Sequence, residues 1–458
     1  MIAAVETRTY LIRATALAAT LTLGVRLAAA PERCGIQVIP LHDPNSPPQT
    51  APIGISADGR FLAFASYAPL LRGDTNGRSD IYVFDMSTSQ LTIESALPDG
   101  SPANADSFDP DISDDGRFLA FHSSGQLIPG SGDDPTQQIV LRDRQLGTSI
   151  VLSMNDAGER GNGSSSGAVI SGDGRVAAFQ SYATNLVSGA DGNGAASDVY
   201  AVTVATRAIV RVSTTSSGRQ HANGASFGPS ISGDGRLIAF TSSAWLDEEQ
   251  QQPAHRTRKA LPLPPNGELR NVFVRDLARS TTQRISRTRR GDANGPSYLP
   301  AISADGRWVA FVSNATDFVA DDDNDASDVF LRDLHTSKIS LVSRSGSGGT
   351  ANGASSRPAI SANGQYVAFE SDASNLVCAK RCSPRELDIN LVADVFAFNR
   401  VKGIVTELSK DPQSGWMEPS GSAVIDGSGN VIAFSSRRPI NDRDQRDDFD
   451  LFVHRRCE

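Results

Sequence analysis

Three acidic stretches of this sequence repeat a similar spacing of oxygen ligands, an arrangement that suits a hard cation; the second stretch is one residue longer than the others. The stretches are Asp74, Asn76 and Asp80; Asp191, Asn193 and Asp198; and Asp322, Asn324 and Asp328. Glycines and small residues between the ligands allow the chain to turn around one ion, as calcium loops do. Asp and Asn also cap tight turns through local hydrogen bonds. The sequence therefore predicts either structural calcium or turn chemistry at these nine positions.

Catalytic side chains are less evident. The six histidines are scattered, and no two are spaced as metal ligands: His42, His122, His221, His255, His335 and His454. Carboxylates are plentiful, but no pair stands out from its surroundings as the pair of a glycosidase would. No serine lies in a nucleophile elbow. The sequence thus predicts no catalytic or cofactor-binding residue beyond the calcium ligands.

The elements that must position these residues are set by a repeat. Seven copies of a pattern such as ISADGRWVAF begin at intervals of 57 to 71 residues, at Ile55, Ile112, Ile170, Ile231, Ile302, Ile360 and, in a worn form, Ile425. Asp-Gly or Asn-Gly supplies a two-residue hairpin turn, and β-branched and aromatic residues flank it. Each copy therefore predicts a strand, a tight turn and a second strand.

Two further strands complete each repeat. In the fifth copy we expect strands at 300–303, 308–313, 328–333 and 338–342. Four antiparallel strands per repeat are typical of a propeller blade, whereas a parallel β-helix would need shorter and more uniform repeats. The last copy lacks its fourth strand, and Ile36, Val38 and Ile39 align with Ile339, Leu341 and Val342. We therefore predict an all-β, seven-bladed propeller of four-stranded antiparallel blades, closed by pairing of an N-terminal strand with the C-terminal blade.

The chain has four cysteines, an even number that suits disulfides in an oxidising compartment. On the alignment of the closing blade, Cys34 and Cys457 flank the turn between its third and fourth strands. We expect a Cys34–Cys457 bond there, and a second bond between Cys378 and Cys382. Two free thiols or a metal pair are the alternative for the second pair, although no nearby ligand completes a zinc set.

Residues 1–30 predict a secretory signal peptide that precedes the propeller of residues 31–458. Arg8 and Arg13 precede an apolar run of about twelve residues and then Ala28, Ala29 and Ala30. An uncleaved N-terminal anchor is the alternative, although the run is shorter than the ~20 residues of a membrane span. The formal net charge of −9 makes the chain a poor nucleic-acid binder. We expect a periplasmic or secreted monomer without a later transmembrane segment.

The repeat, ISxDGRxxAF followed by a strand such as DVFLRD, resembles the WD40-like (PD40) repeat of the TolB family of exported bacterial propellers. The resemblance covers the chain from about residue 34 to its end. It implies a propeller and, as a class, an interaction role, because the same repeat serves unrelated activities. TolB carries a separate α/β domain before its ring, and we expect no counterpart of that domain in this sequence, because only about twenty residues separate the predicted signal from the first repeat.

Differences between the repeats indicate where function should be sought. Blade four carries an insertion at 246–269 and blade six one at 377–392, both between the second and third strands. Function is most often carried on such loops. We expect a non-enzymatic module of the cell envelope that binds a protein or peptide partner on this face. The alternative is a carbohydrate- or peptide-active enzyme, a lyase or hydrolase, with its site at the channel mouth.

Overall fold

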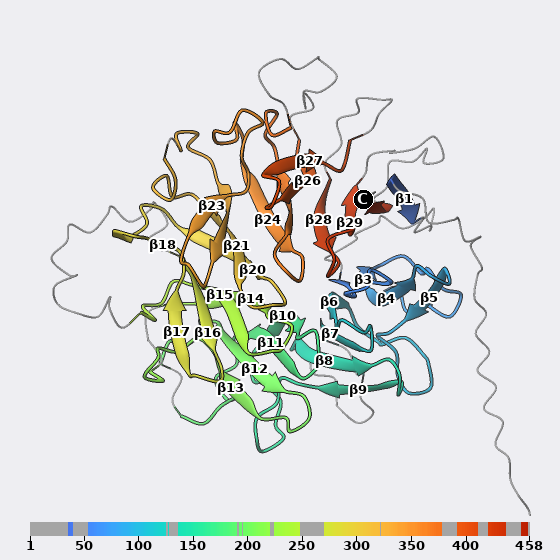
Figure 1. The fold of residues 1–458 in the computed structure, drawn as a ribbon. Coiled ribbons are helices and arrows are strands. Elements are labelled where there is room, and N and C mark those ends of the chain that lie inside the picture. Colours follow the sequence, from blue (N-terminus) through green and yellow to red (C-terminus); the bar gives the residue numbers. More distant parts are fainter. Residues whose placement is uncertain are drawn as a thin grey trace, which may run out of the picture.

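The computed structural model describes residues 35–39, 54–124, 127, 136–189, 192–194, 196–219, 224–247, 270–320, 322–377, 392–410, 420–436 and 450–456. These residues form seven four-stranded antiparallel sheets and one two-stranded ribbon. The sheets surround a central axis as the blades of a propeller (Figure 1). The predicted seven-bladed architecture is therefore confirmed. Within the described ranges no helix is long and apolar enough to cross a membrane.

Each blade places one strand at each of four positions, from the channel outward. The innermost strands are β2 (Gly54–Ile55), β6 (Ser107–Ile112), β10 (Ser165–Ile170), β14 (Ser226–Ile231), β20 (Ser297–Ile302), β24 (Ser355–Ile360) and β28 (Ser420–Ile425). The second strands are β3 (Phe61–Ser66), β7 (Phe118–Ser123), β11 (Val176–Ser181), β15 (Leu237–Ser242), β21 (Trp308–Ser313), β25 (Tyr366–Ser371) and β29 (Val431–Ser436).

The outer half of each blade is equally regular. The third strands are β4 (Asp80–Asp85), β8 (Gln138–Asp143), β12 (Asp198–Thr203), β16 (Asn271–Asp276), β22 (Asp328–Asp333), β26 (Asp394–Asn399) and β30 (Asp450–Arg455). The outermost strands are β5 (Gln90–Ile93), β9 (Thr148–Val151), β13 (Ile209–Arg211), β17 (Thr281–Arg284), β23 (Ile339–Leu341), β27 (Ile404–Glu407) and β1 (Gly35–Ile39). The ribbon of β18 (Arg287–Thr288) and β19 (Gly291–Asp292) lies in the link between blades four and five.

The two ends of the chain close the ring in one sheet. Strand β1 pairs with β30 in the order β1-β30-β29-β28, and Gly35 lies opposite Arg455. Residue Ile36 pairs with His454, as Ile339 pairs with Arg332 in blade five. The predicted alignment of the N-terminal strand is therefore correct.

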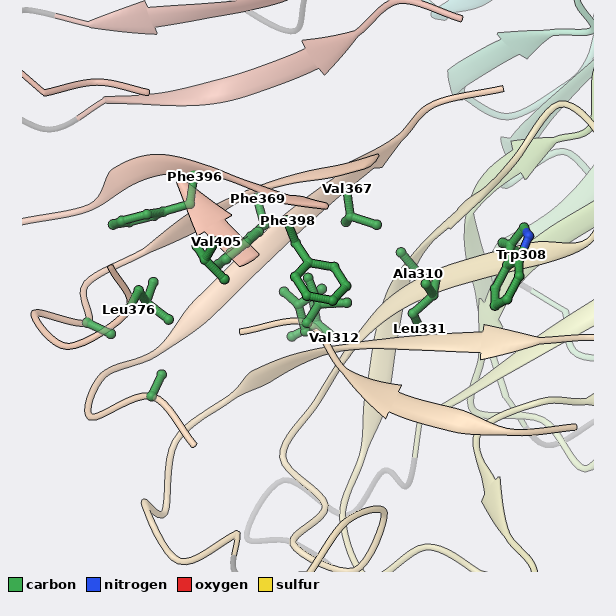
Figure 2. Close-up of a cluster of buried hydrophobic side chains, with 14 residues drawn as sticks. Trp308, Ala310, Val312, Leu331, Val367, Phe369, Leu376, Phe396, Phe398 and Val405 are labelled. Atoms are coloured by element: carbon green, nitrogen blue, oxygen red, sulfur yellow. The ribbon is translucent and has the colours of Figure 1, made fainter. Parts of the chain in front are cut away.

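The core lies between the blades and is built largely from aromatic pairs. In six blades a Phe of the second strand stacks on a Phe or Tyr of the third, with ring centroids 5.7 to 5.9 Å apart. Figure 2 shows the cluster shared by blades five and six, which extends from Trp308 to Leu376 and includes Leu331 and Phe369. Burial of apolar surface on both sides of every sheet explains why the strands read as nearly continuous apolar runs.

The repeated hairpin turn is held by its own side chains. In blade five, Ser303 Oγ donates to Asp305 Oδ1 at 2.5 Å and accepts the Trp308 N–H at 3.0 Å. Asp305 Oδ1 also accepts the Arg307 N–H at 3.0 Å. Gly306 has a φ of 68°, which favours glycine at this position. The turn therefore accounts for its Ser, Asp and Gly without any functional role.

Candidate functional site

The ring has two faces of different character. We call the face with the hairpins between first and second strands the turn face; its hairpins span 57–60, 114–117, 172–175, 233–236, 304–307, 362–365 and 427–430. The opposite face, which carries the loops between second and third strands and the links between blades, we call the loop face.

The hairpins of the turn face form a closed circle of backbone hydrogen bonds. Each hairpin donates one N–H to a carbonyl of the next, at 3.0 to 3.2 Å. The bonds run from Ala57 to Asp114, Asp114 to Gly172, Asp173 to Gly233, Gly233 to Ala304, Asp305 to Ala362, Ala362 to Gly427 and Gly427 back to Ala57. The turn face is thus fastened between all seven blades, including the closing pair.

Just inside the turn face the channel holds a cavity of about 240 Å³. One isoleucine per blade lines it: Ile55, Ile112, Ile170, Ile231, Ile302, Ile360 and Ile425. Asp111 also lines the cavity, and its Oδ2 accepts the Ile170 N–H at 2.8 Å. Burial raises the pKa of Asp111 to about 6. Asp114, Asp426 and Ser230 line the cavity as well, so its wall combines apolar side chains with polar groups.

Nearer the loop face, every described innermost strand from β6 to β28 contains a β-bulge. The pairing register shifts at each bulge. The bulge residue has a positive φ of 46° to 60° and is Asp109, Gly167, Gly228, Leu299, Arg357 or Ser422. Bulges re-aim side chains and are frequent beside active sites. We call these six residues the bulge ring; they surround the channel at its loop-face mouth.

Three residues of the bulge ring are joined to the neighbouring blade by the penultimate residue of its second strand. Gln180 Oε1 accepts the Gly228 N–H at 2.9 Å, and Thr241 Oγ1 accepts the Leu299 N–H at 3.2 Å. Glu370 Oε1 accepts the Ser422 N–H at 2.6 Å. These bonds fix the backbone of the mouth, so that the side chains of the ring are held in place.

His122 occupies the same position in blade two. Its Nδ1 lies 3.5 Å from Asp109 Oδ2, and its ring lies beside Phe108, with centroids 5.7 Å apart. The imidazole is buried, and Nδ1 has no hydrogen-bond partner. Burial lowers the pKa of His122, an effect that the carboxylate of Asp109 opposes. An imidazole that is neutral near pH 7 and adjoins a carboxylate can act as a general base.

Arg357 forms a second charged group in the ring, on blade six. Its guanidinium lies 3.6 Å from Glu370 Oε1, and its side chain is 61 % exposed, against 10 % for Glu370. Burial raises the pKa of Glu370, and the charge of Arg357 opposes this shift. The mouth therefore presents a carboxylate–imidazole pair on blade two and a cation on blade six.

The acidic loops that predicted calcium lie on the loop face, at the outer side of the bulge ring. In blade one, Asn76 Nδ2 donates to Asp80 Oδ2 and to the Ala103 carbonyl, both at 2.7 Å. In blade five, Asn324 Nδ2 donates to Asp328 Oδ2 at 3.0 Å and to the Ala351 carbonyl at 2.9 Å. The amide thus bridges a carboxylate and the next blade link.

The remaining predicted ligands divide into three cases. Asn193 Nδ2 donates to Asp198 Oδ1 at 3.3 Å, whereas Asp191 lies outside the described residues. Asp74 accepts a hydrogen bond from the Tyr82 hydroxyl. Asp322 Oδ1 is buried without a hydrogen-bond partner, and burial raises the pKa of Asp322 to about 6. Among described residues no group of three His, Cys, Asp or Glu side chains could hold a metal ion, so calcium stays a prediction.

Several other predicted features fall outside the described residues. They are Cys34, Cys378, Cys382 and Cys457, residues 1–30, and the greater part of both insertions.

The sequence matches no family model, and no curated protein is similar to it. Among solved structures, the oligogalacturonate lyase of Vibrio parahaemolyticus is 13 % identical, with a TM-score of 0.53, over 94 % of this chain and 96 % of that one. An oligogalacturonate lyase in complex with manganese is 12 % identical, with a TM-score of 0.54, over 95 % and 96 %. TolB from Acinetobacter baumannii gives 16 % identity and a TM-score of 0.40 over 77 % and 64 %. At such low identities, the two matches with TM-scores above 0.5 show a shared fold and no more.

The same comparison corrects one expectation. The two rings that match this chain from end to end belong to enzymes, which contradicts the prediction of a non-enzymatic scaffold. That prediction rested on the absence of a singular His or carboxylate pair in the sequence. His122 and Asp109 are such a pair, but they are thirteen positions apart and meet only because a bulge turns Asp109 toward the neighbouring strand. No motif in the sequence marks this meeting.

Proposed function

We propose that the protein is a carbohydrate-active enzyme, a lyase or hydrolase, whose site is the loop-face mouth of the channel. The observation that carries the proposal is the Asp109–His122 pair at the bulge ring, 3.5 Å apart. The end-to-end similarity to oligogalacturonate lyases supports a saccharide rather than a peptide as substrate.

His122 would serve as the base in either reaction. A lyase removes a proton from carbon next to a carboxylate, and a hydrolase removes one from water; both need an acceptor with a pKa near the working pH. Asp109, next to Nδ1, would orient the imidazole and stabilise its protonated form. Because burial lowers the pKa of His122, we expect activity to rise with pH and to reach its plateau near or below neutrality.

One of the similar lyases binds manganese. Here the described residues of the mouth offer His122 Nδ1 and Asp109 as possible ligands but no third His, Cys, Asp or Glu beside them. A manganese site of three protein ligands is not matched by these residues.

The test is an assay of acidic and neutral polysaccharides with two readouts, formation of unsaturated product for a lyase and of reducing ends for either reaction. We expect His122→Gln to lower kcat about 10²- to 10⁴-fold, as loss of a general base does, and Asp109→Asn to lower it less. His335→Gln is the matched control, because His335 is exposed on the turn face. Full activity of His122→Gln, or no turnover of any saccharide, would refute the proposal.

We also propose that the chain is exported after removal of residues 1–30 and belongs with the TolB-like repeat propellers. The support is the signal-like N-terminus and the seven-fold repeat. Pairing of Gly35 with Arg455 brings the described ends together and supports a Cys34–Cys457 bond. N-terminal sequencing of protein from the periplasm, and mass mapping without reductant, test both points. An intact N-terminus, or free Cys34 and Cys457, would contradict them.

A further inference from the structure

The bulge ring contains two side chains that its backbone does not favour. Gly167 and Gly228 show that the bulge requires a positive φ, which glycine adopts without strain. Leu299 and Arg357 adopt it at 51° and 46°, although such side chains rarely do. Asp109 is better suited to this conformation, because a short polar side chain can form local hydrogen bonds there. Leu299 and Arg357 therefore carry a conformational cost that glycine would avoid.

Packing inside the ring does not offset this cost. The Leu299 side chain is among the exposed large apolar ones, with 41 % of the residue accessible, and the Arg357 side chain is 61 % exposed. Both lie on innermost strands of adjacent blades, β20 and β24, at the same level of the channel. Strained residues with exposed side chains are characteristic of binding sites, where the side chain serves a ligand.

Glu370 positions Arg357 for binding a ligand. Glu370, nearly buried, lies 3.6 Å from one guanidinium nitrogen and is itself fixed by the Ser422 N–H at 2.6 Å. The exposed part of the guanidinium can still donate to a second anion. A guanidinium donates two parallel hydrogen bonds to a carboxylate, which adds geometric specificity to the charge.

We infer that Leu299 and Arg357 form a subsite for an acidic sugar residue, with the carboxylate on Arg357 and the apolar face of the sugar ring on Leu299. Glu370 is a positioning residue for Arg357. The inference rests on the proposed function for the choice of a saccharide, and it adds the charge that the substrate must carry.

The test is calorimetric binding of trigalacturonate and of its methyl ester, which lacks the charge. For the acid, we expect Arg357→Gln to weaken binding about tenfold to a hundredfold, as loss of a hydrogen bond to a charged group does. The ester should bind both proteins equally weakly. Arg175→Gln is the control, because Arg175 is 82 % exposed on the turn face, and we expect it to bind the acid as the wild type does.

A second measurement separates a binding role from a structural one. Leu299→Gly relieves the backbone and removes no ion pair, so it should raise the melting temperature or leave it unchanged while weakening binding of the acid. Equal affinity of wild type and Arg357→Gln for the acid, or no binding of the acid by the wild type, overturns the inference. If the acid binds but is not turned over, the proposed enzymatic function is refuted and the subsite stands. If the acid is turned over equally well by the wild type and Arg357→Gln, the subsite is refuted and the proposed enzymatic function stands.

Discussion

The two faces of this propeller use the same backbone for different purposes. On the turn face, each hairpin glycine packs against the second strand of the preceding blade; Gly116 covers Phe61 and Gly364 covers Trp308. Guanidinium groups add to this layer, since Arg307 and Arg400 lie 4.8 and 4.0 Å from the Trp308 ring. Contact with the neighbouring blade therefore explains the residue types of the turn-face hairpins.

On the loop face the same repeat leaves its side chains free to vary. The bulge residue is acidic, basic, apolar, polar or glycine in different blades, and only its backbone conformation is constant. Hydrogen bonds from neighbouring blades hold that backbone. The contrast indicates that the turn face maintains the ring, whereas the loop face presents chemistry on a fixed frame.

The largest difference between the faces should appear at two glycines with the same φ of 65°. A Cβ at Gly364 would collide with the Trp308 ring, whereas a Cβ at Gly77, on the loop face, meets nothing within 4 Å. We expect Gly364→Ala to lower the free energy of unfolding by about 3 kcal/mol or more, from strain and overpacking together. Gly77→Ala should cost about 1 kcal/mol, from strain alone. Urea unfolding measures both, and equal losses would remove the distinction.

This comparison also shows what the sequence could and could not reveal. The blade number and the closing strand followed from counting copies of one motif, because a motif that forms inter-blade contacts must recur in every blade. The first strand of blade five was expected at 300–303 but spans Ser297–Ile302, since the bulge at Leu299 interrupts the alternation that marks a strand.

The site was hidden for the same reason. Asp109, Leu299 and Arg357 share no side-chain chemistry, so nothing marks their positions as equivalent until the backbone is seen. The available signal was positional: each lies three residues before the repeated isoleucine, at a place where the copies disagree most. A search for a shared motif could not find this site, because its residues differ in type from one blade to the next.

The dependence of stability on pH should differ in sign between ion-paired and buried carboxyl groups. On the turn face, Arg307 lies 2.9 Å from Asp333 and lowers the pKa of that carboxyl to about 2. The Arg307–Asp333 ion pair stabilises the fold above pH 4, and this stabilisation is lost as the pH falls toward 2. The loss should be about 1–2 kcal/mol, because Arg307 is partly exposed to solvent. In the channel and on the loop face, burial raises the pKa of Asp111 and Asp80 to about 6. Protonation of these two groups stabilises the fold as pH falls from 6 to 4.

We therefore expect stability to be greatest near pH 4 to 5, as measured by urea unfolding across pH. Asp333→Asn should flatten the acid side of this curve. Asp111→Asn should be more stable than the wild type at pH 7 by about 1–2 kcal/mol, because it removes a buried charge but keeps an acceptor for the Ile170 N–H. That advantage should vanish near pH 4. A wild-type optimum at or above pH 7 would contradict the assignment of the raised carboxyls.

The smallest effect concerns the acidic loops and asks whether side-chain hydrogen bonds or a cation hold them. In blade five, Asn324 donates two hydrogen bonds that tie Asp328 to the following blade link. Asn324→Ala should therefore lower the free energy of unfolding by about 1 kcal/mol. The loss should be the same in the presence of a chelator and in the presence of calcium. Asp323→Ala is the control, because Asp323 is exposed in the same loop.

The opposite result would identify a cation site. If calcium raises the melting temperature of the wild type and Asn324→Ala is destabilised only when calcium is present, the loop binds the ion. Blade five, rather than blade one, is then where binding should be seen. Asp74 already accepts the Tyr82 hydroxyl, whereas Phe330 stands at the equivalent position in blade five and offers Asp322 no donor. Asp322→Asn should abolish such a calcium effect while Asp74→Asn leaves it in place.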